Sequence, residues 1–239
     1  MAVLKLSGFL KGVSGKAGNA VYRLTKNGTE LSDRPIVNNP QTKAQMDVRA
    51  AFSKATKAWK NLTTAQADAW DAYALTITET EEVSGVKTHR SGFNWYTGLS
   101  SRFYLVNGIS GTAPTTPPTT PFTGDSLTFT IAPGETGSSI EFTASAANTA
   151  GTKTALLLQK LSSANGKPQK NGYRTKGYVA FAAGSLSAEV PVTPGFYSAA
   201  IQYVKTSTGQ ETTTQVVGEV GPISFAVAQG GSNGKKKAA

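Results

Sequence analysis

NPQTKAQMDVRAAFSKATKAWKNLTTAQADAWDAY, residues 39–73, decides the fold of the first half of this 239-residue chain. Its apolar residues recur at intervals of four and three positions, which places them on one face of a helix. The sequence predicts that this helix starts at Asn39-Pro40, because Asn is a good cap and Pro suits the first helical position. The apolar stripe consists of Val48, Phe52, Ala55, Trp59 and Leu62.

A second helix is expected after a very short corner. Thr63-Thr64-Ala65-Gln66 fits a capping box, in which the threonine hydroxyl accepts from the third residue and the glutamine side chain accepts from the threonine N–H. Ser91 is expected to open a third helix, Gly92 to Asn107, which ends with Gly108 in the left-handed conformation. We predict that the helices form one module in residues 39–110. Its predicted core includes Phe52, Trp59, Leu62, Trp70 and Phe103.

Residues 1–38 have the pattern of short β-strands. Asn27-Gly28 between two strand-like runs predicts a hairpin, because a type I′ turn needs positive φ at both central positions. The glycine-rich residues 8–18 predict an extended arm that lies close to a neighbouring backbone. A phosphate-binding loop is excluded there, since Leu10 stands where that motif has glycine and Ala17 where it has Ser or Thr.

A run of threonine and proline, residues 111–124, marks a boundary. It cannot form a helix or a central strand, so we expect a semi-rigid extended linker. Beyond it, seven or eight short strands in residues 125–228 are typical of an immunoglobulin-like or fibronectin type III-like sandwich, and the predicted fold class is α+β. Residues 229–239 are expected to form a flexible basic tail. The predicted strands are 127–131, 140–144, 154–159, 178–181, 186–192, 196–204, 212–217 and 223–227.

The composition leaves few routes to catalysis. The chain has no cysteine, which excludes disulfides, thiolate catalysis and zinc–thiolate sites. Its single histidine, His89, is expected to be an ordinary exposed residue. A glycan hydrolase would need paired carboxylates, but the cluster of Glu79, Glu81 and Glu82 is in a polar loop and is explained as solvated charge. We therefore predict no enzymatic activity, no cofactor and no metal.

Positive charge is concentrated at the two ends of the chain. The net charge is +10, residues 1–60 contain eleven basic and three acidic residues, and Lys235–Lys237 adds a basic tail. Such ends often meet nucleic acid or an acidic protein surface. Charge for solubility, or for electrostatic steering during assembly, is an equally good explanation. The candidate contacts with a partner or a phosphate group are Lys11, Lys16, Arg23, Lys26 and Arg34.

Residues of about 8–108 resemble a family of small bacteriophage and prophage proteins. The shared pattern is an Asn-Pro-x-Thr-x-x-Gln start, a helix that ends in Trp-x-x-Leu-Thr, and then Gln and a second Trp. The family often has Arg in the second helix, where this chain has Ala67 or Asp68, which weakens the transfer of a basic binding face. Ser91-Gly92-Phe93-Asn94 is also similar to that family. The matching residues are Asn39, Pro40, Thr42, Gln45, Trp59, Leu62, Thr63, Gln66 and Trp70.

The resemblance implies a structural protein of a phage particle. We expect the N-terminal module, which comprises the arm, the hairpin and the helices, to dock on a capsid lattice, the preferred location, or on a tail lattice. The protein would be present in many copies. The linker would hold the sandwich outward as a decoration. The alternative is a basic nucleic-acid-binding protein, whose affinity would fall steeply with salt. Since neither a signal peptide nor a run of about 20 apolar residues is visible, we expect synthesis in the host cytoplasm and no contact with a membrane.

Overall fold

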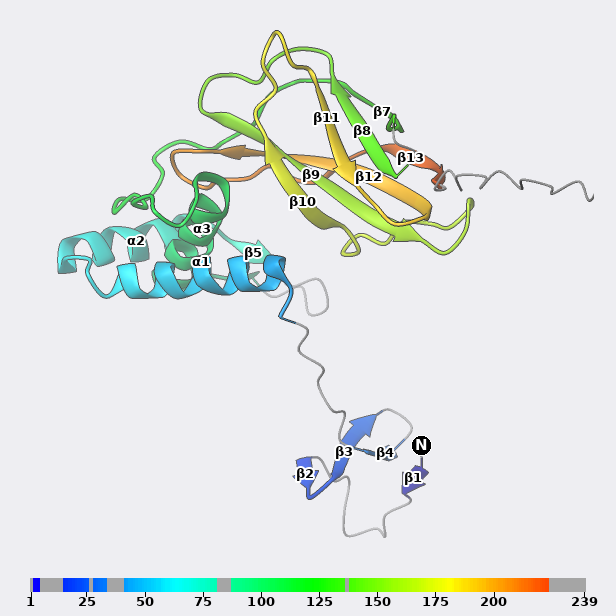
Figure 1. Cartoon of the computed structure of the whole chain (residues 1–239). Helices are drawn as coiled ribbons and strands as arrows, with labels where there is room; N and C mark the ends of the chain where they lie inside the picture. The colour runs from blue at the N-terminus through cyan, green and yellow to red at the C-terminus, as the bar shows by residue number, and fades with distance from the viewer. Residues whose placement is uncertain are drawn as a thin grey trace, which may run out of the picture. The chain divides into compact units, whose positions relative to one another are not determined.

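Figure 1 shows the computed structural model of the chain, which describes residues 2–4, 15–25, 28–33, 41–80, 87–135 and 138–223. Within these residues the fold is α+β, with three helices and antiparallel sheets. The chain divides into two compact units: an N-terminal unit, Met1–Lys43, and a main unit, Ala44–Ala239. The predicted tail, residues 229–239, lies outside the described residues.

The N-terminal unit contains a four-stranded antiparallel sheet. Its strand order is β1-β4-β3-β2. The predicted hairpin is present, because β3 and β4 pair from Ala20 opposite Asp33 to Thr25 opposite Gly28. However, Gly28 is the first residue of β4 and is not a central residue of the turn, as we had expected. Part of the glycine-rich segment that we expected to be an arm is strand β2 of this sheet. The strands are β1 (Ala2–Leu4), β2 (Gly15–Ala17), β3 (Ala20–Thr25) and β4 (Gly28–Asp33).

The main unit begins with the helical module. Helix α1 (Lys43–Trp59) starts later than the predicted Asn39-Pro40, which lies outside the described residues. Helix α2 (Thr64–Thr76) follows, and the predicted capping box is present: Gln66 N donates to Thr63 Oγ1 at 3.3 Å, and Thr63 N donates to Gln66 Oε1 at 2.9 Å. A two-stranded sheet, β5 (Glu79–Thr80) and β6 (Lys87–Thr88), precedes the third helix.

Helix α3 (Gly92–Asn107) has the bounds that the sequence predicts. Ser91 is its cap, and the Ser91 hydroxyl accepts from Asn94 N at 3.3 Å. Gly108 has a positive φ of 88°, but its ψ of 158° takes it out of the left-handed helical region that we expected. The chain therefore leaves α3 in an extended direction.

Aromatic rings fill the core of the helical module. Trp70 is buried and meets Tyr96 edge to face, with ring centroids 5.2 Å apart. Trp59 packs on the same tyrosine at 5.4 Å. Four of the five predicted core residues pack in the two apolar clusters of this module. They are Trp70, which is buried, and Trp59, Leu62 and Phe103, which are partly buried.

Phe52 is not a core residue, and this prediction was wrong. Its side chain is 53% exposed, whereas Ala51 and Ala55 are fully buried against Tyr104 and Ala113. Helix α1 therefore turns its alanines inward. Their small side chains make room for the Tyr104 ring of α3, and the aromatic ring of Phe52, one position further round the helix, is left at the surface.

In the C-terminal half of the main unit, the described residues form a sandwich of seven strands. One sheet has the order β10-β9-β12-β13 and the other has the order β11-β8-β7. The core between them includes Phe142, Phe181, Ile201 and Tyr203. Strand β13 covers part of the predicted strand 212–217 and continues to Ile223, whereas residues 224–227 of the last predicted strand lie outside the described residues. The strands are β7 (Phe129–Pro133), β8 (Ser139–Ala144), β9 (Thr152–Leu161), β10 (Arg174–Val179), β11 (Ser187–Pro191), β12 (Gly195–Lys205) and β13 (Gln215–Ile223).

The proline-rich segment, residues 111–124, contains neither helix nor strand, as its composition predicts. However, it is not a free spacer. Ala113 is buried in the helical core, the Trp70 indole N–H donates to Thr115 O at 2.9 Å, and Phe122 packs against the core of the sandwich. The segment follows the surface of both parts and holds them together.

Direct contacts also join α3 to the sandwich, which lies beside it in Figure 1. Val106 is buried in a cluster with Leu157 and Val204 of the sandwich. Lys153 Nζ donates to Val106 O at 2.9 Å, and Asn107 Nδ2 donates to Thr206 O at 2.7 Å. The helices and the sandwich therefore form one packed body.

At Gly209 the backbone of the sandwich lies directly against α3. Its φ is +74°, and a Cβ there would collide with the carbonyl oxygen of Leu99 on α3 and come within 3.0 Å of Phe103 N. Only a residue without a side chain can occupy this position, because both the conformation and the space exclude a Cβ.

We expect Gly209→Ala to lower the free energy of unfolding by about 1–3 kcal/mol, because alanine is strained at positive φ and displaces α3. Gly98→Ala on α3 is the matched control, since a Cβ at Gly98 meets nothing within 4 Å. That substitution should be neutral or should stabilise the helix. Urea unfolding of both variants measures the difference, and equal stabilities would show that the Gly209 contact does not matter.

Candidate functional site

Two of the five predicted contact residues can be placed in the N-terminal sheet. Lys16 is opposite Val21, and Arg23 is two residues further along the same strand, so both side chains lie on one face of the sheet. Both are exposed, and Arg23 is opposite Glu30. The structure thus brings Lys16 and Arg23 together. The other three, Lys11, Lys26 and Arg34, lie outside the described residues.

The opposite face of this sheet carries Tyr22 and Leu31, which are paired directly across strands β3 and β4. Both are only half-buried. Among the side chains that the structure describes in this unit, Thr29 alone is buried. The sheet therefore has one face with basic residues and one with apolar residues, and the described part of the unit contains no buried apolar core.

The main unit has a cavity of about 360 Å³ where the helices meet the sandwich. Tyr73 and Trp95 from the helical module and Phe122 from the proline-rich segment form its apolar part. Its polar part comes from both sides of the junction. The polar lining residues are Arg90, Arg102, Gln210 and Glu211.

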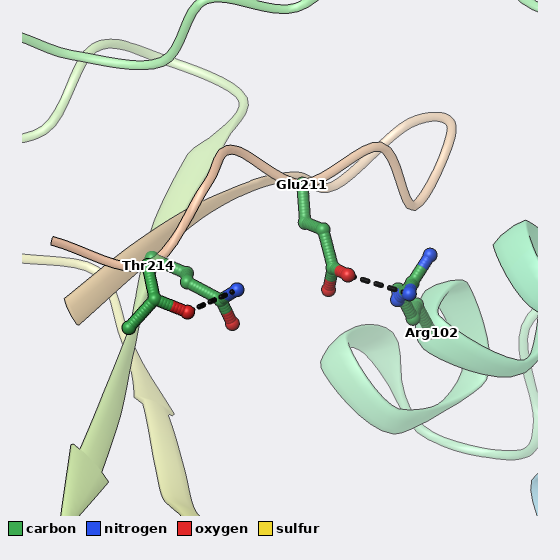
Figure 2. Close-up of polar contacts among 4 residues, drawn as sticks. Arg102, Glu211 and Thr214 are labelled. Atoms are coloured by element: carbon green, nitrogen blue, oxygen red, sulfur yellow. Dashed lines mark hydrogen bonds and ion pairs between the residues drawn. The ribbon is translucent and has the colours of Figure 1, made fainter. Parts of the chain in front are cut away.

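An ion pair between Arg102 and Glu211 crosses this cavity. Figure 2 shows the Arg102 guanidinium, on α3, reaching the Glu211 carboxylate, which lies between β12 and β13, with an N–O distance of 2.5 Å. Burial raises the pKa of Glu211, and the neighbouring Arg102 only partly offsets this. Next to it, Gln202 Nε2 donates to Thr214 Oγ1 at 3.0 Å.

The other polar groups of the cavity are engaged with protein atoms. The Arg90 guanidinium lies over the Trp95 ring, 5.6 Å from its centroid. Gln210 Nε2 donates to Thr120 O at 3.0 Å, and its Oε1 accepts from Thr208 Oγ1 at 2.9 Å. The cavity is therefore best explained as part of the joint between helices and sandwich.

The other candidate side chains do not form a cluster in the part of the chain that the structure describes. No group of three His, Cys, Asp or Glu side chains is placed there to hold a metal ion. His89 is exposed, with Nδ1 2.9 Å from Ile77 O. Of the acidic cluster, Glu79 is in β5, whereas Glu81 and Glu82 are outside the described residues. None of the described helices is long and apolar enough to cross a membrane.

Sequence reasoning missed the Arg102–Glu211 pair. The two residues are far apart in the chain, and each has ordinary polar neighbours in the sequence. No local pattern could have identified them, because only the packing of α3 on the sandwich brings them together.

Comparisons with protein-family models, with curated proteins and with solved structures found no match to this chain.

We expect Arg102→Met to lower the free energy of unfolding at neutral pH by up to about 1 kcal/mol, because Glu211 would keep its charge in a partly buried place without its partner. Glu211→Gln should cost less, since the amide carries no charge. The pKa of Glu211 is raised in the folded protein. The folded state therefore binds the proton of this carboxyl group more tightly than the unfolded state does. As the pH rises from the ordinary glutamate pKa through the raised pKa of the folded protein, the carboxyl group makes the wild-type protein less stable.

Urea unfolding between about pH 4 and about pH 8, a range that includes the ordinary glutamate pKa and a raised one, tests this. The destabilisation caused by Arg102→Met should shrink as the pH falls, because a protonated Glu211 needs no partner. A loss that does not change with pH would show that Arg102 acts through packing alone.

Proposed function

We propose that this chain is a structural protein of a phage particle, present in many copies, which docks through its N-terminal unit on a capsid lattice or, as a second choice, on a tail lattice. The observation that carries this proposal is the N-terminal sheet. It belongs to a separate compact unit, and the apolar residues Tyr22 and Leu31 on one of its faces are only half-buried.

A sheet of this size needs a second layer. Units of roughly 40 residues seldom bury enough apolar surface to be stable alone. A neighbouring subunit that covers the Tyr22 and Leu31 face would supply this layer. The outer strands β1 and β2 are three residues each, and a partner strand that pairs with either edge would extend the sheet.

The sandwich is proposed to be immunoglobulin-like, in the broad sense that includes fibronectin type III domains. Its two sheets of three and four antiparallel strands support this. A further support is Tyr197 near the start of β12, whose hydroxyl donates to Thr193 O at 2.8 Å. Immunoglobulin-like domains characteristically have a tyrosine near the start of the sixth strand, and its hydroxyl forms a hydrogen bond with the backbone a few residues upstream.

The packed joint changes how this sandwich would be displayed. From the sequence we expected residues 111–124 to be a spacer that holds the sandwich outward as a decoration. Because residues 111–124 are packed on both parts, the helices and the sandwich are proposed to project from the lattice as one rigid body. The N-terminal unit would then be the anchor.

Sedimentation with purified particles tests the proposal. The intact chain should pellet with the particles, and a variant that lacks residues 1–38 should remain in the supernatant while retaining the unfolding transition of the main unit. If the intact chain does not pellet, the proposed function is wrong. If both forms pellet equally, the lattice assignment stands but docking through the N-terminal unit does not.

The alternative, nucleic-acid binding, is favoured by one observation: Lys16 and Arg23 lie on the same exposed face. Phosphate contacts by these residues would make DNA affinity fall steeply between low and moderate salt. Replacing Lys11, Lys16, Arg23 and Lys26 by Ala should then reduce both the affinity and its salt dependence. Unchanged binding after these substitutions, or none in the wild type, would exclude this alternative.

A further inference from the structure

We infer that two exposed helix faces of the helical module, one on α1 and one on α2, bind each other between copies of this chain. The contact would be head to tail, with α1 of one copy on α2 of the next. The inference rests on the proposed function for its setting, a particle that holds many copies side by side.

The first surface, the α1 face, consists of Val48, Arg49, Phe52 and Lys60. Val48, Arg49 and Phe52 lie on one side of the helix, and Lys60 follows directly after its last residue, Trp59. All four are exposed, and Val48 and Phe52 are each 53% exposed. It is a large apolar surface bordered by cations, left outside because Ala51 and Ala55 occupy the core.

The second surface, the α2 face, consists of Ala65, Asp68, Ala72 and Leu75, spaced by three, four and three residues. All four are exposed, and Leu75 is 69% exposed. Helix α2 contains two aspartates and no basic residue. The small alanines leave space into which a larger side chain of a partner fits.

The two faces are opposite in charge, and one carries large apolar side chains where the other carries small ones. From Lys43 to Lys60 the chain has five basic residues and one acidic residue, whereas α2 has only acidic charges. Phe52 and Val48 would lie on the alanines and Leu75 of the partner, and Arg49 or Lys60 would approach Asp68. Each copy of the chain carries both faces, and a lattice would hold many copies close together.

Other parts of this chain fit the α1 face less well. The first 38 residues have six basic and two acidic residues, so they would be repelled by the cations on α1. Two different faces on each copy make the contact heterologous, which gives a ring or an open chain of copies rather than a closed dimer.

Charge reversal of the full-length chain provides the test. Arg49→Glu/Lys60→Glu puts acidic residues on both faces, and Asp68→Lys puts basic residues on both. Sedimentation velocity at low salt should show that the wild type associates with rising concentration and that each variant associates at least about tenfold more weakly, because like charges oppose each other across the contact. An equimolar mixture of the two variants should associate again, since each restores the complement of the other.

Controls separate this contact from general charge effects. Lys167→Glu/Lys176→Glu makes the same change in net charge as the α1 variant at exposed positions of the sandwich, and Glu135→Lys matches Asp68→Lys. Both controls should associate like the wild type. Phe52→Ser and Leu75→Ser test the apolar part, and should weaken association with little change in unfolding temperature because both side chains are exposed.

The association measurements test the contact between α1 and α2 independently of the proposed function. A wild-type chain that stays monomeric at every concentration, variants that associate normally, or a mixture that fails to recover would each overturn it. If the chain pellets with particles while these results are negative, the contact between α1 and α2 is wrong and the proposed function stands. If the copies associate as expected but do not pellet with particles, the contact is right and the phage assignment is wrong.

Discussion

The C-terminal end of α3 is held from two sides, and the arrangement of the main unit depends on it. The last carbonyl groups of a helix have no partner within the helix, and cations are favourable beside them. Here Lys153 of β9 donates to Val106 O, while Lys54 of α1 reaches Ile109 O and Gly111 O just beyond the helix. One lysine comes from the sandwich and the other from the helical module, so the end of α3 fixes both parts in place.

This constraint explains the route of the proline-rich segment. Once the helices and the sandwich are fixed, the chain between them has a short and defined path. Prolines suit that path because they favour an extended backbone with little conformational freedom to lose. Polar backbone groups along it find partners, as Thr115 O does in the Trp70 indole. A segment with the composition of a linker thus becomes part of the folded body.

The same packing determines which surfaces are left for partners. The Tyr104 ring of α3 packs on α1 at Ala51 and Ala55, whose small side chains leave room for it. The larger Val48 and Phe52 are then excluded from the core and exposed. The N-terminal sheet differs, because its half-buried Tyr22 and Leu31 have no second layer within the described part of their unit. Both regions carry apolar surface together with basic residues, which lie beside it on α1 and on the opposite face of the N-terminal sheet, as expected of a protein that works in contact with others.

The sequence by itself determined the features that depend on neighbouring residues. The capping box at Thr63, the cap at Ser91 and the hairpin of β3 and β4 all follow from local hydrogen bonding and backbone preference. Alternation of apolar residues likewise predicted most strands of the sandwich, because strand period is a local property.

Only the tertiary structure decided the features that depend on distant residues. The periodicity of α1 admits several neighbouring faces, and the fit to α3 selected the alanines over Phe52. Arg102 and Glu211 meet because α3 packs beside the turn between β12 and β13. Whether residues 111–124 separate two domains or join them was likewise undecided by composition, since the outcome depends on the surfaces at both ends of the segment.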